Sequence, residues 1–150
     1  MVLNFHGSSW KCLQNNSKNN PPFSSFVISL ILRGEKKDLD LLSSSIEIMP
    51  TDTYAPDGNE NGELDAWYFR IKSESLEQLE VVSNEFFDKI KDINFILDKI
   101  ITIKAEINLH VHAELAQIHF ELPQSMLDNL VQIKIPFGIS ILSWGMVEDK

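Results

Sequence analysis

Residues 104–122 decide the fold, and their sequence is KAEINLHVHAELAQIHFEL. From Ile103 to His112 apolar and polar residues alternate, which is typical of a strand that buries one face. The alternation stops at residues 113–116 and resumes from Gln117 to Leu122. The pattern therefore predicts two strands joined by a four-residue loop in an antiparallel hairpin.

Such a hairpin would place three of the four histidines on the polar face of the sheet. Its register sets His110 opposite His119, and His112 follows two residues along the same face. Imidazoles on neighbouring strands, with Glu106 or Glu121 nearby, are a ligand set for zinc. Two imidazoles two residues apart on a strand are separated by about 7 Å, so a shared ion needs side chains that lean together. We expect no cofactor. Zinc is the alternative, and an ordinary solvated or partner-covered sheet face also fits the pattern.

The rest of the chain predicts further strands and helices around this hairpin. Residues 26–32 are apolar on both faces, which indicates a central strand. Residues 75–99 have apolar side chains at helical spacing, a capping box at Ser75 and Gln78, and capping residues for a restart near Asp92 to Asn94. Further expected elements are a helix at 38–46 capped by Asp38, a loop at 51–62, a strand at 66–72, a helix at 123–131 lined by Met126, Leu127, Leu130 and Val131, and a strand from 135 to about 144.

These elements predict an α+β fold. We expect a two-layer sandwich, in which one long and two short helices cover a mixed or antiparallel sheet of about five strands. The polar, proline-terminated residues 1–22 predict a flexible N-terminal tail, and residues 23–150 predict a single α+β domain. The chain of 150 residues, 43% of them hydrophobic, has enough apolar side chains for one core.

Cysteine content and hydropathy predict a cytoplasmic protein without a membrane partner. Cys12 is the only cysteine, so no disulfide forms within the chain. The N-terminus does not read as a signal peptide, and the longest apolar run, 26–32, is too short to cross a bilayer.

The negative charge is concentrated in one part of the sequence. Residues 35–99 contain 16 of the 22 acidic and 7 of the 13 basic residues, so the whole net charge of −9 falls within them. This excess disfavours nucleic acid as a partner, because phosphate binding needs a basic patch. It fits either simple solubility or a surface that attracts a basic protein. The expected partner-binding residues lie on or beside the 51–62 loop: Asp52, Asp57, Glu60, Glu63 and Asp65.

Motifs for catalysis or calcium binding are incomplete or missing. Residues 57–65 match the start of an EF-hand loop, but Tyr68 occupies the twelfth position, where a bidentate glutamate is required. An Asn/Gly-rich turn explains them better. The sequence shows no glycine-rich phosphate loop, no Gly-x-Ser-x-Gly motif and no Cys/His pair in a supporting context. We therefore expect a protein that is not an enzyme.

Three segments resemble an uncharacterised bacterial family, domain of unknown function 4279. They are the opening strand and helix with Ile46–Thr51, the strand containing Trp67, and Ile118–Pro123 with Leu127, Leu130 and the final strand. The resemblance implies a two-layer α+β fold and supplies no catalytic residues. Together with the acidity, it leads us to expect an immunity-type inhibitor that neutralises a basic bacterial toxin, such as a nuclease. The alternative is a metal- or small-ligand-binding module that uses the histidine face. The oligomeric state stays open.

Overall fold

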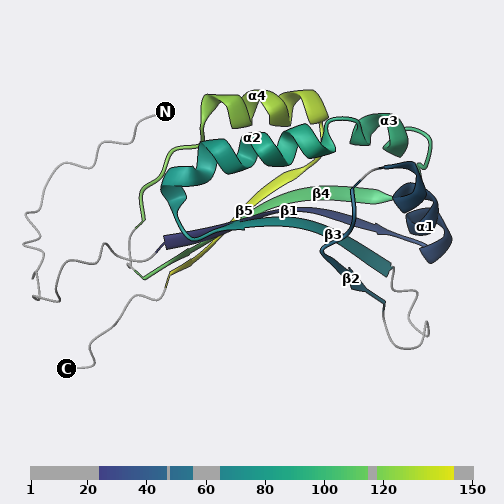
Figure 1. Ribbon diagram of the computed structural model, residues 1–150, viewed down its shortest axis with the longest axis horizontal. Helices are drawn as coiled ribbons and strands as arrows, with labels where there is room; N and C mark the ends of the chain where they lie inside the picture. The colour runs from purple at the N-terminus through teal and green to yellow at the C-terminus, as the bar shows by residue number, and fades with distance from the viewer. Residues whose placement is uncertain (1–23, 47, 56–64, 115–117, 144–150) are drawn as a thin grey trace, which may run out of the picture.

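The computed structural model describes residues 24–46, 48–55, 65–114 and 118–143. In this part of the chain, helices cover one face of a five-stranded sheet, which is the predicted two-layer α+β fold (Figure 1). The strands are β1 (Ser24–Gly34), β2 (Asp52–Tyr54), β3 (Asp65–Ser73), β4 (Lys104–Ala113) and β5 (Phe137–Ser143). The helices are α1 (Lys36–Ser45), the 3-10 turn η2 (Leu76–Gln78), α2 (Leu79–Ile90), α3 (Ile93–Leu97) and α4 (Gln124–Ile133).

The sheet is mixed, and its order is β2-β3-β1-β4-β5. Strand β1 runs antiparallel to both β3 and β4, β2 is antiparallel to β3, and β5 is parallel to β4. The central position predicted for residues 26–32 is confirmed. The two faces of β1 are both buried, as the exposures of Leu30 (0%) and Ile31 (7%) show, and burial of both faces is typical of a central strand.

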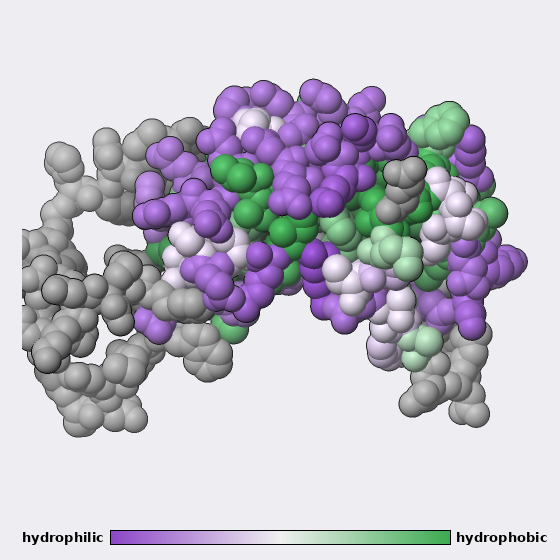
Figure 2. All heavy atoms as spheres, viewed as in Figure 1, coloured by the Kyte–Doolittle hydropathy of each residue, from purple (hydrophilic) through white to green (hydrophobic). Residues whose placement is uncertain are grey.

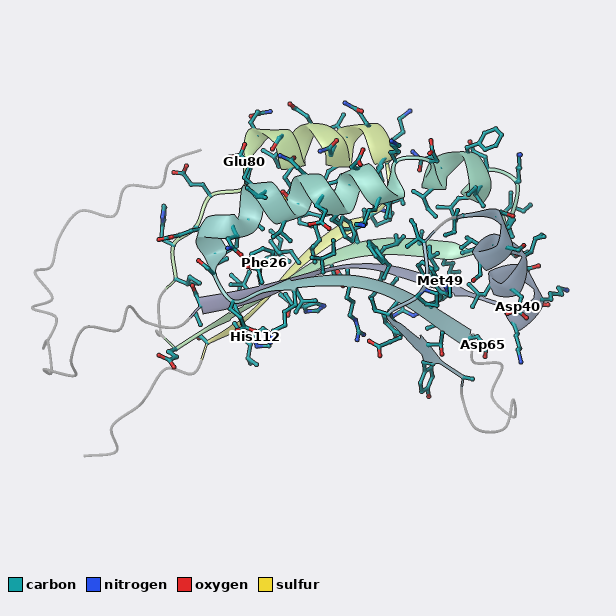
Figure 3. The ribbon with its side chains drawn as sticks, in the orientation of Figure 1. Phe26, Asp40, Met49, Asp65, Glu80 and His112 are labelled. Atoms are coloured by element: carbon teal, nitrogen blue, oxygen red, sulfur yellow. The ribbon has the colours of Figure 1, made fainter. Side chains whose placement is uncertain are left out.

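The core lies between the sheet and the helices. Strands β1 and β4 contribute alternate apolar side chains, among them Phe26 and Leu109, and Figure 3 shows Phe26 on the helical side of the sheet. The helix stripe predicted for residues 75–99 is confirmed, since Leu79, Phe86 and Ile90 are buried in this core. The ring of Phe86 stacks on that of Phe69 with 5.6 Å between centroids.

The predicted hairpin of residues 104–122 is wrong. Strand β4 forms as expected, but its neighbours are β1 and β5, and residues 118–123 form no strand. Their alternation has another cause: Ile118, Phe120 and Leu122 pack against the core, whereas His119 and Glu121 are exposed. A coil that covers the margin of a core alternates as a strand does. After it, α4 carries the chain back so that β5 pairs parallel with β4.

The expected restart within residues 75–99 is confirmed. Helix α2 ends at Ile90, two turn residues follow, and α3 begins at Ile93. The start differs from a capping box: the Ser75 hydroxyl accepts from the amide of Glu77, but the Gln78 side chain binds Ser73.

Three smaller predictions are corrected. The 51–62 segment contains strand β2, which is too short to show a period. Helix α1 starts after Glu35, so Asp38 lies in its first turn and accepts from the Thr102 hydroxyl at 2.5 Å. On α4, Leu127 and Val131 are 38% and 74% exposed instead of lining the core.

None of the helices in the described ranges is long and apolar enough to cross a membrane.

Candidate functional site

The face of the sheet opposite the helices, called here the open face, carries the polar side chains of β4. Figure 1 shows the sheet curving so that this face is concave, and Figure 3 shows His112 projecting from it. The side chain of Arg33 forms a 2.9 Å ion pair with Glu106. Asn108 donates its side-chain amide to the same carboxylate at 3.1 Å. The middle of the open face is therefore an internally satisfied polar network.

The structure does not bring the three predicted histidine ligands together. His110 lies between Val27 of β1 and Ser140 of β5, and His112 is two residues along the same face. His119 lies in the exposed coil before α4, outside the sheet. Among the described residues, no group of three or more His, Cys, Asp or Glu side chains is placed to hold a metal ion. The zinc alternative loses the geometry on which it depended.

The five predicted partner-binding acids have different surroundings. Asp52 lies on the open face, where its carboxylate pairs with Arg70 at 2.5 Å, and the Arg70 guanidinium lies 4.4 Å from the ring centre of Tyr68. The charge of Asp52 is thus compensated within the protein. Asp65 begins β3, on the face of the sheet that carries Trp67. The remaining three, Asp57, Glu60 and Glu63, lie outside the described residues.

Asp65 lines a hollow of about 340 Å³ between α1, β2 and β3. We call this the acidic hollow, because Asp40 of α1 lines it as well. Neither carboxylate has a hydrogen-bond or ion-pair partner among the described residues. Figure 3 shows Asp40 and Asp65 at the same end of the molecule, on two different elements. The other lining residues are Lys36, Leu39, Ser43, Pro50, Thr53, Tyr54, Ala55, Ala66 and Trp67.

The aromatic side chains of the acidic hollow differ in exposure. Tyr54 is 52% exposed, whereas Trp67 is buried at 2%. The indole Nε1 of Trp67 is a buried donor without an acceptor among the described residues. Unpaired buried donors are uncommon, because each forgoes its hydrogen bond to water.

Sequence reasoning found Asp65 but missed Asp40. Asp40 belongs to α1 and Asp65 begins β3, and strand β2 lies between them in the sequence. They line one hollow because α1 packs beside β3. Asp40 is an exposed acidic residue on a helix, and most such residues are simply solvated, so its sequence position did not mark it as a site residue.

A larger groove of about 710 Å³ lies between the end of α1 and the α2–α3 junction. Its apolar lining includes Phe69, Ile93 and Ile96, and Met49 beside them is 79% exposed. The charged lining residues have both signs: Asp88, Lys89, Lys91 and Asp92. The mixture does not select a ligand charge, and Asp88 and Lys91 already pair at 3.3 Å.

Charge also separates between the two layers. Figure 2 shows a hydrophilic outer surface over α2 and α4. In the helical layer the acids Glu77, Asp92 and Asp98 are exposed and have no ion-pair partner among the described residues. The open face carries more cationic than acidic residues within the described ranges: Arg33, Arg70, Lys72 and Lys104 against Asp52 and Glu106. Within the described ranges, the excess of negative charge therefore lies on the helical layer and in the acidic hollow.

Comparisons with protein-family models, curated proteins and solved structures found no match. The resemblance to domain of unknown function 4279 stays a prediction.

Proposed function

We propose that this protein is an immunity-type inhibitor that binds a basic protein partner, and that it receives a lysine or arginine side chain of that partner in the acidic hollow. The observation that carries the proposal is that Asp40 and Asp65 line one hollow and that neither has an ion-pair partner among the described residues, while Lys36 is the one basic residue in the same lining. Exposed carboxylates that lack an internal partner are free to pair with an incoming cation at little cost to the fold.

The walls of the acidic hollow suit a guanidinium or ammonium group. The half-exposed ring of Tyr54 lines it beside the two carboxylates. Aromatic faces attract cations, and arginine both stacks on rings and pairs with carboxylates. A neutral or acidic ligand gains neither interaction.

The sequence between β2 and β3 is rich in acidic residues. Ala55 and Asp65, which flank the 56–64 segment, both line the hollow. The segment between them adds three carboxylates, Asp57, Glu60 and Glu63. In sequence, further negative charge therefore lies between two residues that line the hollow, and negative charge near a binding site speeds the encounter with a basic partner.

A toxin that acts on nucleic acid is the partner class that fits best. Such a protein presents lysine and arginine side chains for phosphate. An acidic domain that occupies those side chains blocks substrate binding without any catalytic group of its own. The histidine alternative is not favoured, since His119 lies apart from His110 and His112.

The test begins with copurification from the native cell at low salt, and continues with the affinity of the purified partner. Reversal of both hollow acids, Asp40→Lys with Asp65→Lys, should weaken binding tenfold or more, which corresponds to about 1.4 kcal/mol. The matched control reverses Asp92 and Asp98, two exposed acids of the α3 region that do not line the hollow. It should change affinity far less.

Two results would count against the proposal. One is a partner that binds the hollow variant and the wild type equally well. The other is an affinity that does not fall with added salt, because exposed charges are screened within about 8 Å at physiological ionic strength.

A further inference from the structure

Strand β5 is an exposed apolar edge of the sheet. Its residues Ile139, Ile141 and Leu142 are 46%, 51% and 47% exposed. Among the described residues, no strand pairs with its outer side. Sheet edges are normally shielded by charge, proline or short length. The opposite edge, β2, has three residues and the Asp52–Arg70 ion pair, whereas Phe137–Ser143 contains no charged residue and no proline.

The backbone of β5 has its free groups on alternate residues. The Ile107 amide donates to the Pro136 carbonyl at 2.8 Å, so Pro136 points toward β4. Successive residues of a strand direct their backbone groups to opposite sides. The outward N–H and C=O groups of β5 therefore belong to Phe137, Ile139, Ile141 and Ser143.

We infer that β5 pairs with β5 of a second copy of this chain, antiparallel and centred on Ser140. In this register Ile139 of one copy faces Ile141 of the other, and both have outward backbone groups, so they exchange two hydrogen bonds. All residues of Phe137–Ser143 find partners, and no other two-fold register uses the whole strand.

The side chains are complementary in the same register. Ile139 and Ile141 share the helical side of the sheet, because they lie beside the buried Leu109 and Val111. Pairing brings four isoleucines of the two copies together there. On the open face, Leu142 lies opposite Gly138 of the other copy, where no side chain competes for space.

Charge distribution permits this pairing despite the net charge of −9. The acidic hollow lies beside β2 and β3, at the opposite edge of the sheet from β5. The dimer therefore keeps the two hollows apart. A seven-residue strand buries less than the roughly 800 Å² per partner of a standard interface, so we expect a weak dimer.

The sharpest test is a crosslink at the two-fold axis, in full-length chain with Cys12→Ser. In the proposed register the two Ser140 Cα atoms are about 4.5 Å apart, within disulfide range. Ser140→Cys should give covalent dimers on mild oxidation. Ser143→Cys is the matched control, since its two copies lie about 20 Å apart along the strands and should not crosslink. Equal crosslinking at both positions, or none at Ser140→Cys, would overturn the register.

Sedimentation of the full chain at concentrations up to about 1 mM tests the dimer itself, against a monomer mass of 17.2 kDa. Ile141→Pro removes an outward N–H that β4 does not use, so it should abolish the dimer and keep the monomer folded by circular dichroism. Ile101→Lys, at an 89% exposed position, should leave the dimer intact. A chain that stays monomeric at every concentration contradicts the proposal. So does a dimer that forms only after residues 1–23 are removed, because the chain itself would then occupy the edge.

Discussion

Phe86 shows how a single residue joins the two layers. Its side chain is 0% exposed, stacks on Phe69 from the sheet, and meets Phe87 edge-on with 5.3 Å between centroids. Aromatic contacts of this kind add to the free energy of burial. The helical period alone identified Phe86 as a core residue, because burial of one helix face leaves that signature in sequence.

We predict that Phe86→Ala lowers the free energy of unfolding by about 3–5 kcal/mol, through lost burial and the cavity left behind. Chemical denaturation followed by circular dichroism measures this change. Val81→Ala, on the same helix at 72% exposure, is the control and should change stability by less than about 0.5 kcal/mol. If both variants unfolded at the same denaturant concentration, Phe86 would not be a core residue.

Trp67 combines a buried apolar ring with a buried donor. Its indole Nε1 has no acceptor among the described residues, whereas the ring packs in the core. Nothing in the sequence marks that donor as unpaired, since its surroundings come from α1 and β2.

At the scale of elements, the start of α2 depends on a serine outside the helix. The Ser73 hydroxyl donates to Gln78 at 2.7 Å and accepts from the amide of Ser75 at 3.3 Å. Ser73 is 6% exposed, so water does not readily replace these bonds. The sequence predicted a capping arrangement here but assigned it to Ser75 and Gln78 alone.

Ser73→Ala should therefore destabilise the protein by about 1–3 kcal/mol, the usual cost of leaving partly buried hydrogen-bond partners unsatisfied. The matched control is Ser44→Ala, whose exposed hydroxyl bonds only to the Leu41 carbonyl within α1. Thermal unfolding of both variants measures the difference. Equal midpoints would show that the Ser73 bonds add nothing to the stability of α2.

Period-two alternation was informative for β4 and misleading for residues 118–122. Alternate side chains are buried in β4, and alternate side chains of the second segment are partly buried where they cover the core margin from a coil. Alternation reports one-sided burial, and hydrogen bonding to a neighbour is a separate condition that a single sequence does not reveal. For the same reason, the order of the strands and the parallel β4–β5 pair were outside what the pattern predicts.

At the scale of the whole molecule, charge was predictable in amount but not in arrangement. The sequence located the acidic excess in residues 35–99. Folding then compensates Asp52 with Arg70 and places Asp40 and Asp65 in the lining of one hollow. Both the ion pair and the shared hollow join residues of different elements. They depend on how α1, β2 and β3 pack, so no local sequence pattern predicts them.

The central claim is that the acidic hollow receives a cationic side chain, and amide NMR of the full chain tests it directly. The spectra are recorded at low salt during titration with an arginine-containing peptide and with its citrulline counterpart, which lacks the charge. We expect the arginine peptide alone to shift the backbone amides of Tyr54 and Ala66 and the indole N–H of Trp67. Asp40→Asn with Asp65→Asn should abolish these shifts, whereas Asp92→Asn with Asp98→Asn should retain them. Shifts confined to the α2–α3 surface, or equal shifts with both peptides, would contradict the account.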